Sequence, residues 1–147
     1  MSLLPVAEAQ ARLFALARPL PAESVAVGAA VGRWLADDVA ALRDQPWTDL
    51  SAMDGYAVRA AEHPGPWRIV GESAAGSATL SPLAPGDACR IFTGAPVPPG
   101  ADSILIQENA VVDGDRLTAS ADPLPAGRHV RRHASDFACG APLLRPH

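Results

Sequence analysis

The sequence predicts an α+β fold in which a mixed α/β element, made from both ends of the chain, carries an inserted all-β domain, a small barrel or sandwich. The N-terminal segment has helical apolar spacing, the middle alternates short apolar runs with turn residues, and the tail returns to an extended pattern. We therefore assign residues 1–41 with 128–147 to a mixed α/β linker or dimerisation domain, and residues 42–127 to a β-rich domain.

The composition excludes several classes of protein. Apolar types make up 48% of the 147 residues and charged types 19%, so burial can offset the entropy of the chain and a folded protein is expected. The net charge is -4 and the basic cluster at 128–133 is short, which argues against a nucleic-acid partner. No apolar run is long enough for a membrane span or a signal peptide. We expect a cytoplasmic protein without a membrane partner.

The two cysteines, Cys89 and Cys139, lie far apart and form no C-x-x-C pair, which argues against a zinc site. Cys89 stands inside the apolar run 88–92, where a thiol is usually a small buried hydrophobe. This use of cysteine is typical of a reducing compartment.

The N-terminal element begins with an expected helix over 6–20, because apolar residues recur there at a spacing of three to four. Pro5 suits its first turn, and Pro19 and Pro21 end it. The apolar stripe packs either on its own domain or on a partner chain. A short strand at 24–27, a second helix at 28–35 and a strand at 38–42 follow.

The middle of the chain is expected to form strands at 67–70, 88–92, 103–107 and 116–119. Turn signals built from Pro, Gly and Asp separate these runs. The tail, 127–146, is expected to form one or two strands. Asp102 and Glu108 should lie at opposite ends of one strand, so they are not expected to act as a carboxylate pair.

The segment 51–58 combines a carboxylate, a glycine and the chain's single tyrosine, and it has neither helical nor strand periodicity, so we expect a structured loop. One interpretation is an Asp-Gly turn in which Asp54 caps its own backbone and Gly55 takes a positive φ. The other is a site in which Gly55 lets a ligand approach while Asp54 holds a cation or orients a water.

The segment 91–100 places Thr93 at the end of an apolar strand, before a glycine and a proline-rich turn. Its exposed hydroxyl could donate to an oxyanion, with the Gly94 N–H beside it. The alternative is a threonine that only ends a strand. Arg131, Arg132 and Asp136 form either an anion pocket or a solvated face with local ion pairs.

Three segments together resemble the molybdopterin molybdenumtransferase family, the molybdenum insertases that include the C-terminal part of gephyrin. They are 49–58 with Met-Asp-Gly-Tyr, 91–102 with Thr-Gly-Ala-Pro followed by Ile-Gln-Glu at 106–108, and Val-Arg-Arg-His-Ala-Ser-Asp-Phe at 130–137. Their order and spacing also fit, and Gly-Arg-Trp-Leu-Ala at 32–36 is similar to the family's opening. The resemblance is to the family's N-terminal two-domain portion.

The resemblance implies insertion of molybdenum from molybdate into adenylylated molybdopterin, with release of AMP and help from Mg²⁺. It implies Asp54, Thr93 and Asp136 as catalytic residues, with Asp54 also the metal-binding residue. The implied substrate-binding residues are Gly55, Tyr56 and Gly94. Asp54 could bind magnesium, steer molybdate or position a water.

The resemblance also implies a homodimer in which this portion faces the substrate-binding domain of the other subunit, so that the active site is shared. Asp136 matches the family's Arg-x-x-Gly-x-Asp pattern, except that Ala134 replaces the glycine; if a positive φ is required there, alanine is strained. Because the family's pterin-binding and C-terminal domains are absent from these residues, we expect the chain alone to be inactive. The alternative functions are a dimerisation or docking module for other molybdenum cofactor assembly proteins, or an unrelated β-rich domain.

Overall fold

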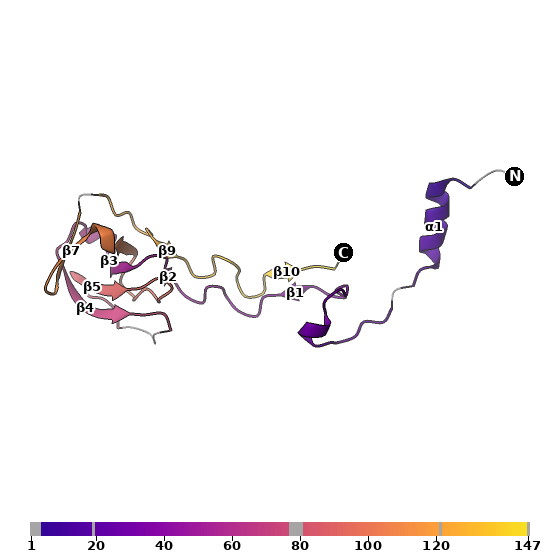
Figure 1. Ribbon diagram of the computed structural model, residues 1–147, viewed down its shortest axis with the longest axis horizontal. Coiled ribbons are helices and arrows are strands. Elements are labelled where there is room, and N and C mark those ends of the chain that lie inside the picture. The colour runs from indigo at the N-terminus through magenta and orange to yellow at the C-terminus, as the bar shows by residue number, and fades with distance from the viewer. Residues whose placement is uncertain (1–3, 19, 77–80, 121, 147) are drawn as a thin grey trace. The chain divides into compact units, whose positions relative to one another are not determined.

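The computed structural model describes residues 4–18, 20–76, 81–120 and 122–146 (Figure 1). The chain divides into two units, one made of residues 1–38 with 145–147 and one of residues 39–144. Among the described residues there is one α-helix, and most of the remaining regular structure is sheet, in broad agreement with the predicted α+β class. No described helix is long and apolar enough to cross a membrane.

The N-terminal unit contains the helix α1 (Val6–Leu16) and the short 3-10 helix η1 (Val27–Ala29). Helix α1 ends four residues before the predicted end, and Ala17 is already extended, with a ψ of 134°. The proline at 19 explains this, because the residue before a proline avoids the helical region. None of the residues in α1 is buried, so its apolar stripe packs against no core among the described residues of the unit.

Two predictions for the N-terminal unit were wrong. The segment 24–26 forms no strand, and the expected helix at 28–35 is replaced by the three residues of η1. Gly32 adopts a φ of 79°, which breaks the helical path after one turn. Helical spacing over so short a run therefore did not overcome the low helix propensity of its two glycines, Gly28 and Gly32.

In the second unit, segments from the two ends of its sequence run antiparallel. Strand β1 (Val39–Ala40) pairs with β10 (Pro142–Leu144), and β2 (Leu50–Ser51) pairs with β9 (Val130–Arg131). Between these pairs, Gln45 and Phe137 form an isolated bridge. The prediction of one or two strands in the tail is confirmed, and the strand predicted at 38–42 is reduced to β1.

A mixed six-stranded sheet has the order β6-β3-β5-β4-β8-β7. Figure 1 labels its strands β3, β4, β5 and β7. Its strands are β3 (Gly55–Val58), β4 (Trp67–Ser73), β5 (Asp87–Ile91), β6 (Ser103–Ile106), β7 (Ala110–Asp113) and β8 (Arg116–Ala119), with 3-10 helices η2 (Ala60–Glu62) and η3 (Gln107–Asn109) between them. Only β4 and β5 run parallel; the other neighbours are antiparallel. Each of the four strands predicted in this region is present, whereas β7 was not predicted.

The side chains of the sheet alternate between two buried clusters, as the period of two in a strand requires. On β3, Ala57 belongs to one cluster and Val58 to the other, and both are fully buried. Cys89 is buried as predicted; burial, with the negative charge of Glu72 nearby, raises the pKa of its thiol to about 11. The thiol is therefore protonated at neutral pH and acts as a small core side chain.

The prediction of a loop at 51–58 was wrong for its second half. Gly55–Val58 forms the inner strand β3, which lies between β5 and β6. Gly55 does not take the positive φ expected of an Asp-Gly turn. A Cβ on Gly55 would lie 2.0 Å from the carbonyl oxygen of Leu105 and 2.9 Å from the Cα of Ile106. The glycine is required because the backbone of β6 occupies the space of a side chain.

Gly55→Ala is expected to lower the free energy of unfolding by about 3 kcal/mol or more, because the backbones of β3 and β6 would have to separate. The matched control is Gly71→Ala in β4, where an added Cβ meets no atom within 4 Å. Its effect should stay within about 1 kcal/mol. Urea-induced unfolding of both variants measures the difference, and equal losses would contradict the proposed close approach.

Candidate functional site

Asp54 and Thr93 come together because the strands that they flank are neighbours. Asp54 immediately precedes β3, and Thr93 follows β5 by two residues. In the antiparallel register Gly55 lies opposite Ile91, so the start of β3 and the end of β5 reach the same edge of the sheet. The sheet thus brings together two residues that are 39 positions apart in the chain.

Both hydrogen-bond donors of Thr93 bind one carboxylate oxygen. The Thr93 N–H and the Thr93 hydroxyl each donate to Oδ1 of Asp54 at 2.7 Å. The carbonyl of Asp54 accepts the N–H of Gln107 at 3.1 Å, which fixes the backbone beside the carboxylate. Asp54 therefore caps the turn after β5, and not its own backbone as one interpretation of the sequence expected.

These bonds lower the pKa of Asp54. The largest cause is the backbone N–H of Thr93, followed by its hydroxyl, while the positive charge of Arg90 contributes in the same direction. Each of these groups stabilises the ionised carboxylate. Asp54 is therefore a half-buried anion at neutral pH, and its second oxygen, Oδ2, accepts no hydrogen bond within the part of the chain that the structure describes.

The two donors expected to bind an oxyanion, the Thr93 hydroxyl and the Gly94 N–H, are both engaged in hydrogen bonds within the chain. Thr93 is exposed, as predicted, but its hydroxyl proton is directed to Asp54. The Gly94 N–H donates to the carbonyl of Ser51 at 2.8 Å. Gly94 has a φ of 81°, with open space where a Cβ would be, so its role in the turn is conformational.

Arg90 is the residue of this region that the sequence analysis missed. Its Nη1 donates to the carbonyl of Gly55 at 2.9 Å and its Nη2 to Oε1 of Gln107 at 3.0 Å. The guanidinium carbon also lies 5.1 Å from the ring centre of Tyr56 and 4.8 Å from that of Phe92. The available signal was an arginine inside the otherwise apolar run 88–92.

Asp136 lies on the returning segment, residues 130–144, which runs antiparallel to the outgoing segment, residues 39–51. It makes contacts other than those of Asp54 and Thr93. Its carboxylate binds Arg131 and its N–H donates to the carbonyl of Gln45 at 2.9 Å. No hydrogen bond or ion pair between described residues joins it to Asp54 or Thr93. The structure therefore unites two of the three expected catalytic residues in one contact.

The arginines near Asp136 are paired, which favours the interpretation as local ion pairs over the anion pocket. Arg131 pairs with Asp136, and Arg132 donates to Oδ2 of Asp49 at 2.7 Å. All four side chains are substantially exposed. Ala134, between them, adopts a φ of 57°, so the position does require the left-handed conformation that glycine adopts without strain.

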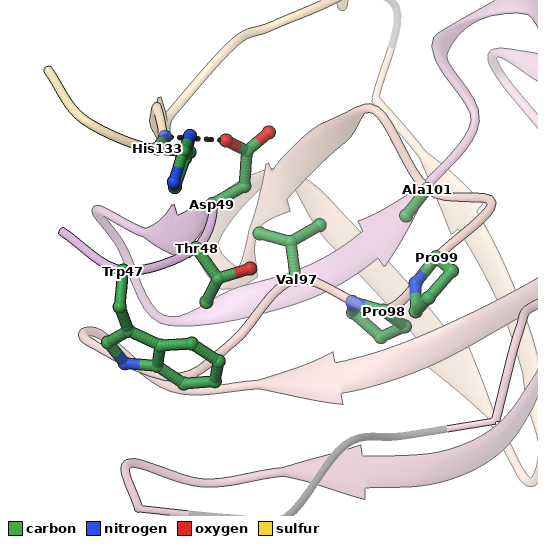
Figure 2. Close-up of a pocket in the computed structure, with 8 residues that line it drawn as sticks. All are labelled: Trp47, Thr48, Asp49, Val97, Pro98, Pro99, Ala101 and His133. Carbon is green, nitrogen blue, oxygen red and sulfur yellow. Dashed lines mark hydrogen bonds between the residues drawn. The ribbon is translucent and has the colours of Figure 1, made fainter. Parts of the chain in front are cut away.

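A hollow of about 310 Å³ lies beside the outgoing segment and the proline-rich turn (Figure 2). Asp49 lies at its rim, and both of its oxygens are occupied, by the Arg132 side chain and the His133 N–H. Neither Asp54 nor Thr93 lines it. Its lining consists of Trp47, Thr48, Asp49, Val97, Pro98, Pro99, Ala101 and His133.

The described residues contain no ready-made cluster of metal-binding side chains. No group of three or more His, Cys, Asp and Glu side chains converges in that part of the chain. Asp54 is the expected metal ligand, and it offers one carboxylate oxygen, Oδ2. Any cation held there would take its other ligands from water, a substrate or another domain.

The fold and the site together define a β-rich module that presents an aspartate–threonine pair at one edge of its sheet and is joined to a short antiparallel ribbon. A model of the MoeA N-terminal region (domain I and II) matches residues 4–147. The chain belongs to this family.

Curated relatives show the same resemblance. The chain is 41% identical to the molybdopterin molybdenumtransferase of Nostoc sp. over 129 residues, which is 83% of this chain and 29% of the relative. It is 40% identical to that of Synechococcus elongatus over 134 residues, 86% of this chain and 33% of the relative. The chain thus spans about a third of the length of these proteins.

A solved structure supports the fold. The molybdopterin biosynthesis MoeA protein from Pyrococcus horikoshii superimposes with a TM-score of 0.83 at 26% identity, over 98% of this chain and 38% of the other. The fold described above is therefore similar to a portion of that larger protein.

Thr93→Val is expected to raise the pKa of Asp54 toward its ordinary value, because the hydroxyl donor is lost while the backbone donor remains. Carboxyl ¹³C NMR titration measures this pKa. Since the folded pKa lies below the unfolded one, the stabilisation from ionised Asp54 is complete above the unfolded pKa and is lost as pH falls through the folded pKa. The variant should therefore lose less stability on acidification.

The control for this titration is Thr118→Val in β8, which removes a threonine hydroxyl from another strand of the same sheet. The pKa of Asp54 should remain at its wild-type value in this variant. A Thr93→Val protein with the wild-type pKa of Asp54 would contradict the hydroxyl bond.

Ala134→Gly is expected to raise the free energy of unfolding by about 1 kcal/mol, because glycine adopts the left-handed conformation without the steric cost that alanine has there. Ala138→Gly, in the same segment but without a positive φ, is the control and should lower stability by about 0.5 kcal/mol. Urea titration compares them; a loss of stability in both would show that the alanine at 134 is unstrained.

Proposed function

We propose that this chain supplies one side of the active site of a molybdopterin molybdenumtransferase, which inserts molybdenum from molybdate into adenylylated molybdopterin and releases AMP. The observation that carries this proposal is the pair of 2.7 Å bonds from Thr93 to Asp54, which joins the two motifs into one site. The names of the relatives from Nostoc and Synechococcus support the reaction class. This chain alone is proposed to be inactive, because the remaining two thirds of such relatives would hold the pterin.

The residues at the pair fit a magnesium ion, and Asp54 would hold it through Oδ2. Magnesium commonly takes one or two protein carboxylates and completes its shell with water and substrate phosphates, so one free carboxylate oxygen is sufficient. When bound, the ion supplies electrostatic stabilisation of charge on phosphate oxygens. Thr93 holds Oδ1 through two bonds, which leaves Oδ2 in a fixed orientation.

Electrostatics separates the three roles considered for Asp54. The lowered pKa keeps the carboxylate anionic, and molybdate is also an anion, so direct contact between them is repulsive. This disfavours steering of molybdate by Asp54 and favours binding a cation or orienting a water. Because the Thr93 hydroxyl donates to Asp54, its oxygen presents lone pairs outward and would accept a bond from that water.

The other proposed residues have supporting positions. Tyr56 and Gly94 flank the pair along the chain and are proposed to contact substrate, whereas Gly55 serves the site through its close packing on β6. Asp136 is proposed as a third acid, with one of its carboxylate oxygens, Oδ2, paired with Arg131.

The proposed assembly is a homodimer in which the substrate-binding domain of one subunit faces Asp54 and Thr93 of the other. A second candidate function is a dimerisation or docking module for other molybdenum cofactor assembly proteins. The observation that favours it is the exposure of apolar side chains in the N-terminal unit, where Phe14 is 75%, Val27 90% and Trp34 82% exposed. None of the described residues of this unit, 4–18, 20–38 and 145–146, is buried, so these side chains enter no core among them.

The test mixes this chain with a full-length relative whose own Met-Asp-Gly-Tyr aspartate is changed to alanine, and it follows molybdate-dependent AMP release. The chain is expected to restore turnover by at least about tenfold over the disabled relative, because it supplies Asp54 across the interface. The chain with Asp54→Asn should pair equally well and restore nothing.

Asp113→Asn, on the exposed strand β7, is the matched control and should restore turnover as well as the unaltered chain does. Pairing is measured independently by size-exclusion chromatography with light scattering. If pairing is complete and no variant restores turnover, the docking-module function is favoured. If Asp54→Asn restores it fully, Asp54 has no catalytic role.

A further inference from the structure

The side chain of Arg90 contacts residues of both motifs, close to the point where Asp54 and Thr93 meet. It belongs to β5, and its guanidinium carbon lies 5.1 Å from the ring centre of Tyr56 and 4.8 Å from that of Phe92. Tyr56 belongs to the first motif, and Phe92 immediately precedes Thr93. The cation therefore contacts one aromatic ring from each of the two motifs.

The two terminal nitrogens of Arg90 form hydrogen bonds next to Asp54, one with backbone and one with a side chain. Nη1 donates to the carbonyl of Gly55, the residue after Asp54, at 2.9 Å. Nη2 donates to the side chain of Gln107 at 3.0 Å, and the N–H of Gln107 donates in turn to the carbonyl of Asp54 at 3.1 Å. The peptide units on both sides of Gly55 are thus connected to one guanidinium, the Gly55–Tyr56 unit directly and the Asp54–Gly55 unit through Gln107.

We infer that Arg90 is a positioning residue that fixes the Asp54–Thr93 pair by bridging the turn before β3, the turn after β5 and the start of η3. This inference rests on the proposed function, in which the pair belongs to an active site. Arg90 itself contacts neither side chain of the pair, so it acts through Gly55, Phe92 and Gln107. A misplacement of such a pair by about 1 Å can lower turnover by about 100-fold.

The bridge depends on the shape of the guanidinium as well as its charge. Arginine presents a planar fork with several N–H donors, whereas lysine presents one ammonium on a flexible stem. Lysine at this position could reach Gly55 or Gln107, but it could not hold both and also stack on two rings. The comparison of Arg90→Lys with Arg90→Gln therefore separates bridging from simple charge.

The first measurement is amide hydrogen exchange by NMR in the 147-residue chain. The N–H of Thr93 is bonded to Asp54, so its protection reports how well the pair is held. In Arg90→Gln and in Arg90→Lys its exchange should become at least about tenfold faster, while the amides of Ala57 and Ile104 within the sheet keep their wild-type rates. A uniform acceleration of all three amides, or wild-type protection of Thr93 in either variant, would overturn the inference.

The matched control is Arg68→Gln in β4, which removes an arginine bonded to Asp87 on the same sheet. Thr93 protection should not change in this variant. Gln107→Met removes a single bond of the bridge and is expected to accelerate exchange at Thr93 less than Arg90→Gln does. This milder variant provides the test if the Arg90 variants do not fold, and unchanged protection of Thr93 in it would then overturn the inference.

The second measurement is AMP release by a full-length family member that carries this chain as its front portion. Arg90→Lys should lower kcat by about 10-fold to 100-fold with KM nearly unchanged, because the pair is misplaced and the pterin is held elsewhere. Faster exchange at Thr93 with wild-type kcat would overturn the positioning role and would also count against the proposed function. Wild-type exchange at the Thr93 amide together with a reduced kcat would overturn the bridging by Arg90 and leave the proposed function standing.

Discussion

The close contact between β3 and β6 at Gly55 is the constraint on which the arrangement of Asp54 and Thr93, at the ends of the inner strands β3 and β5, depends. The carbonyl oxygen of Leu105 occupies the position that a Cβ on Gly55 would take, at 2.0 Å. This contact places β3 between β5 and β6, and the antiparallel register with β5 then brings the turn before β3 to the turn after β5. The Asp54–Thr93 pair is thus a consequence of backbone packing beside it.

The returning segment is held to the rest of the unit by acidic side chains. Asp44 accepts the N–H of Cys139 at 2.8 Å, and Asp49 accepts the N–H of His133 at 2.7 Å. The pKa of Asp49 is lowered: burial opposes the shift, and the bonds from His133 and Arg132 outweigh it. The pKa of Asp44 is also lowered, chiefly by the backbone N–H of Cys139. These carboxylates join segments about 90 positions apart, where short strands alone supply few bonds.

The two units differ in how their apolar side chains are used. In the second unit, residues such as Trp67, Ile91 and Leu117 are completely or almost completely buried, and each stabilises the fold by about 1.5–3 kcal/mol. In the first unit, α1 buries no residue, and Leu16 is 78% exposed. The hydrophobic effect therefore accounts for the sheet, while the apolar stripe of α1 remains available for a contact outside the unit.

The sequence by itself determined the strands whose apolar runs were bounded by proline and glycine turns, together with the burial of Cys89 and the exposure of Thr93. Those features are local, since turn residues fix backbone angles and an apolar run of strand length favours burial. The sequence also carried the family resemblance, because two long motifs kept their order and spacing. It did not determine β3, which is short, rich in small residues and stable only between two neighbouring strands.

Tertiary structure alone decided which polar groups meet. The choice of Thr93 as the partner of Asp54, the use of the Gly94 N–H by Ser51 and the bridge from Arg90 all depend on strand register, which spacing along the chain does not encode. The sequence likewise raised the question of a positive φ at Ala134, and the tertiary structure determined that this residue is left-handed. Register is set by long-range packing, and packing is a property of the whole sheet.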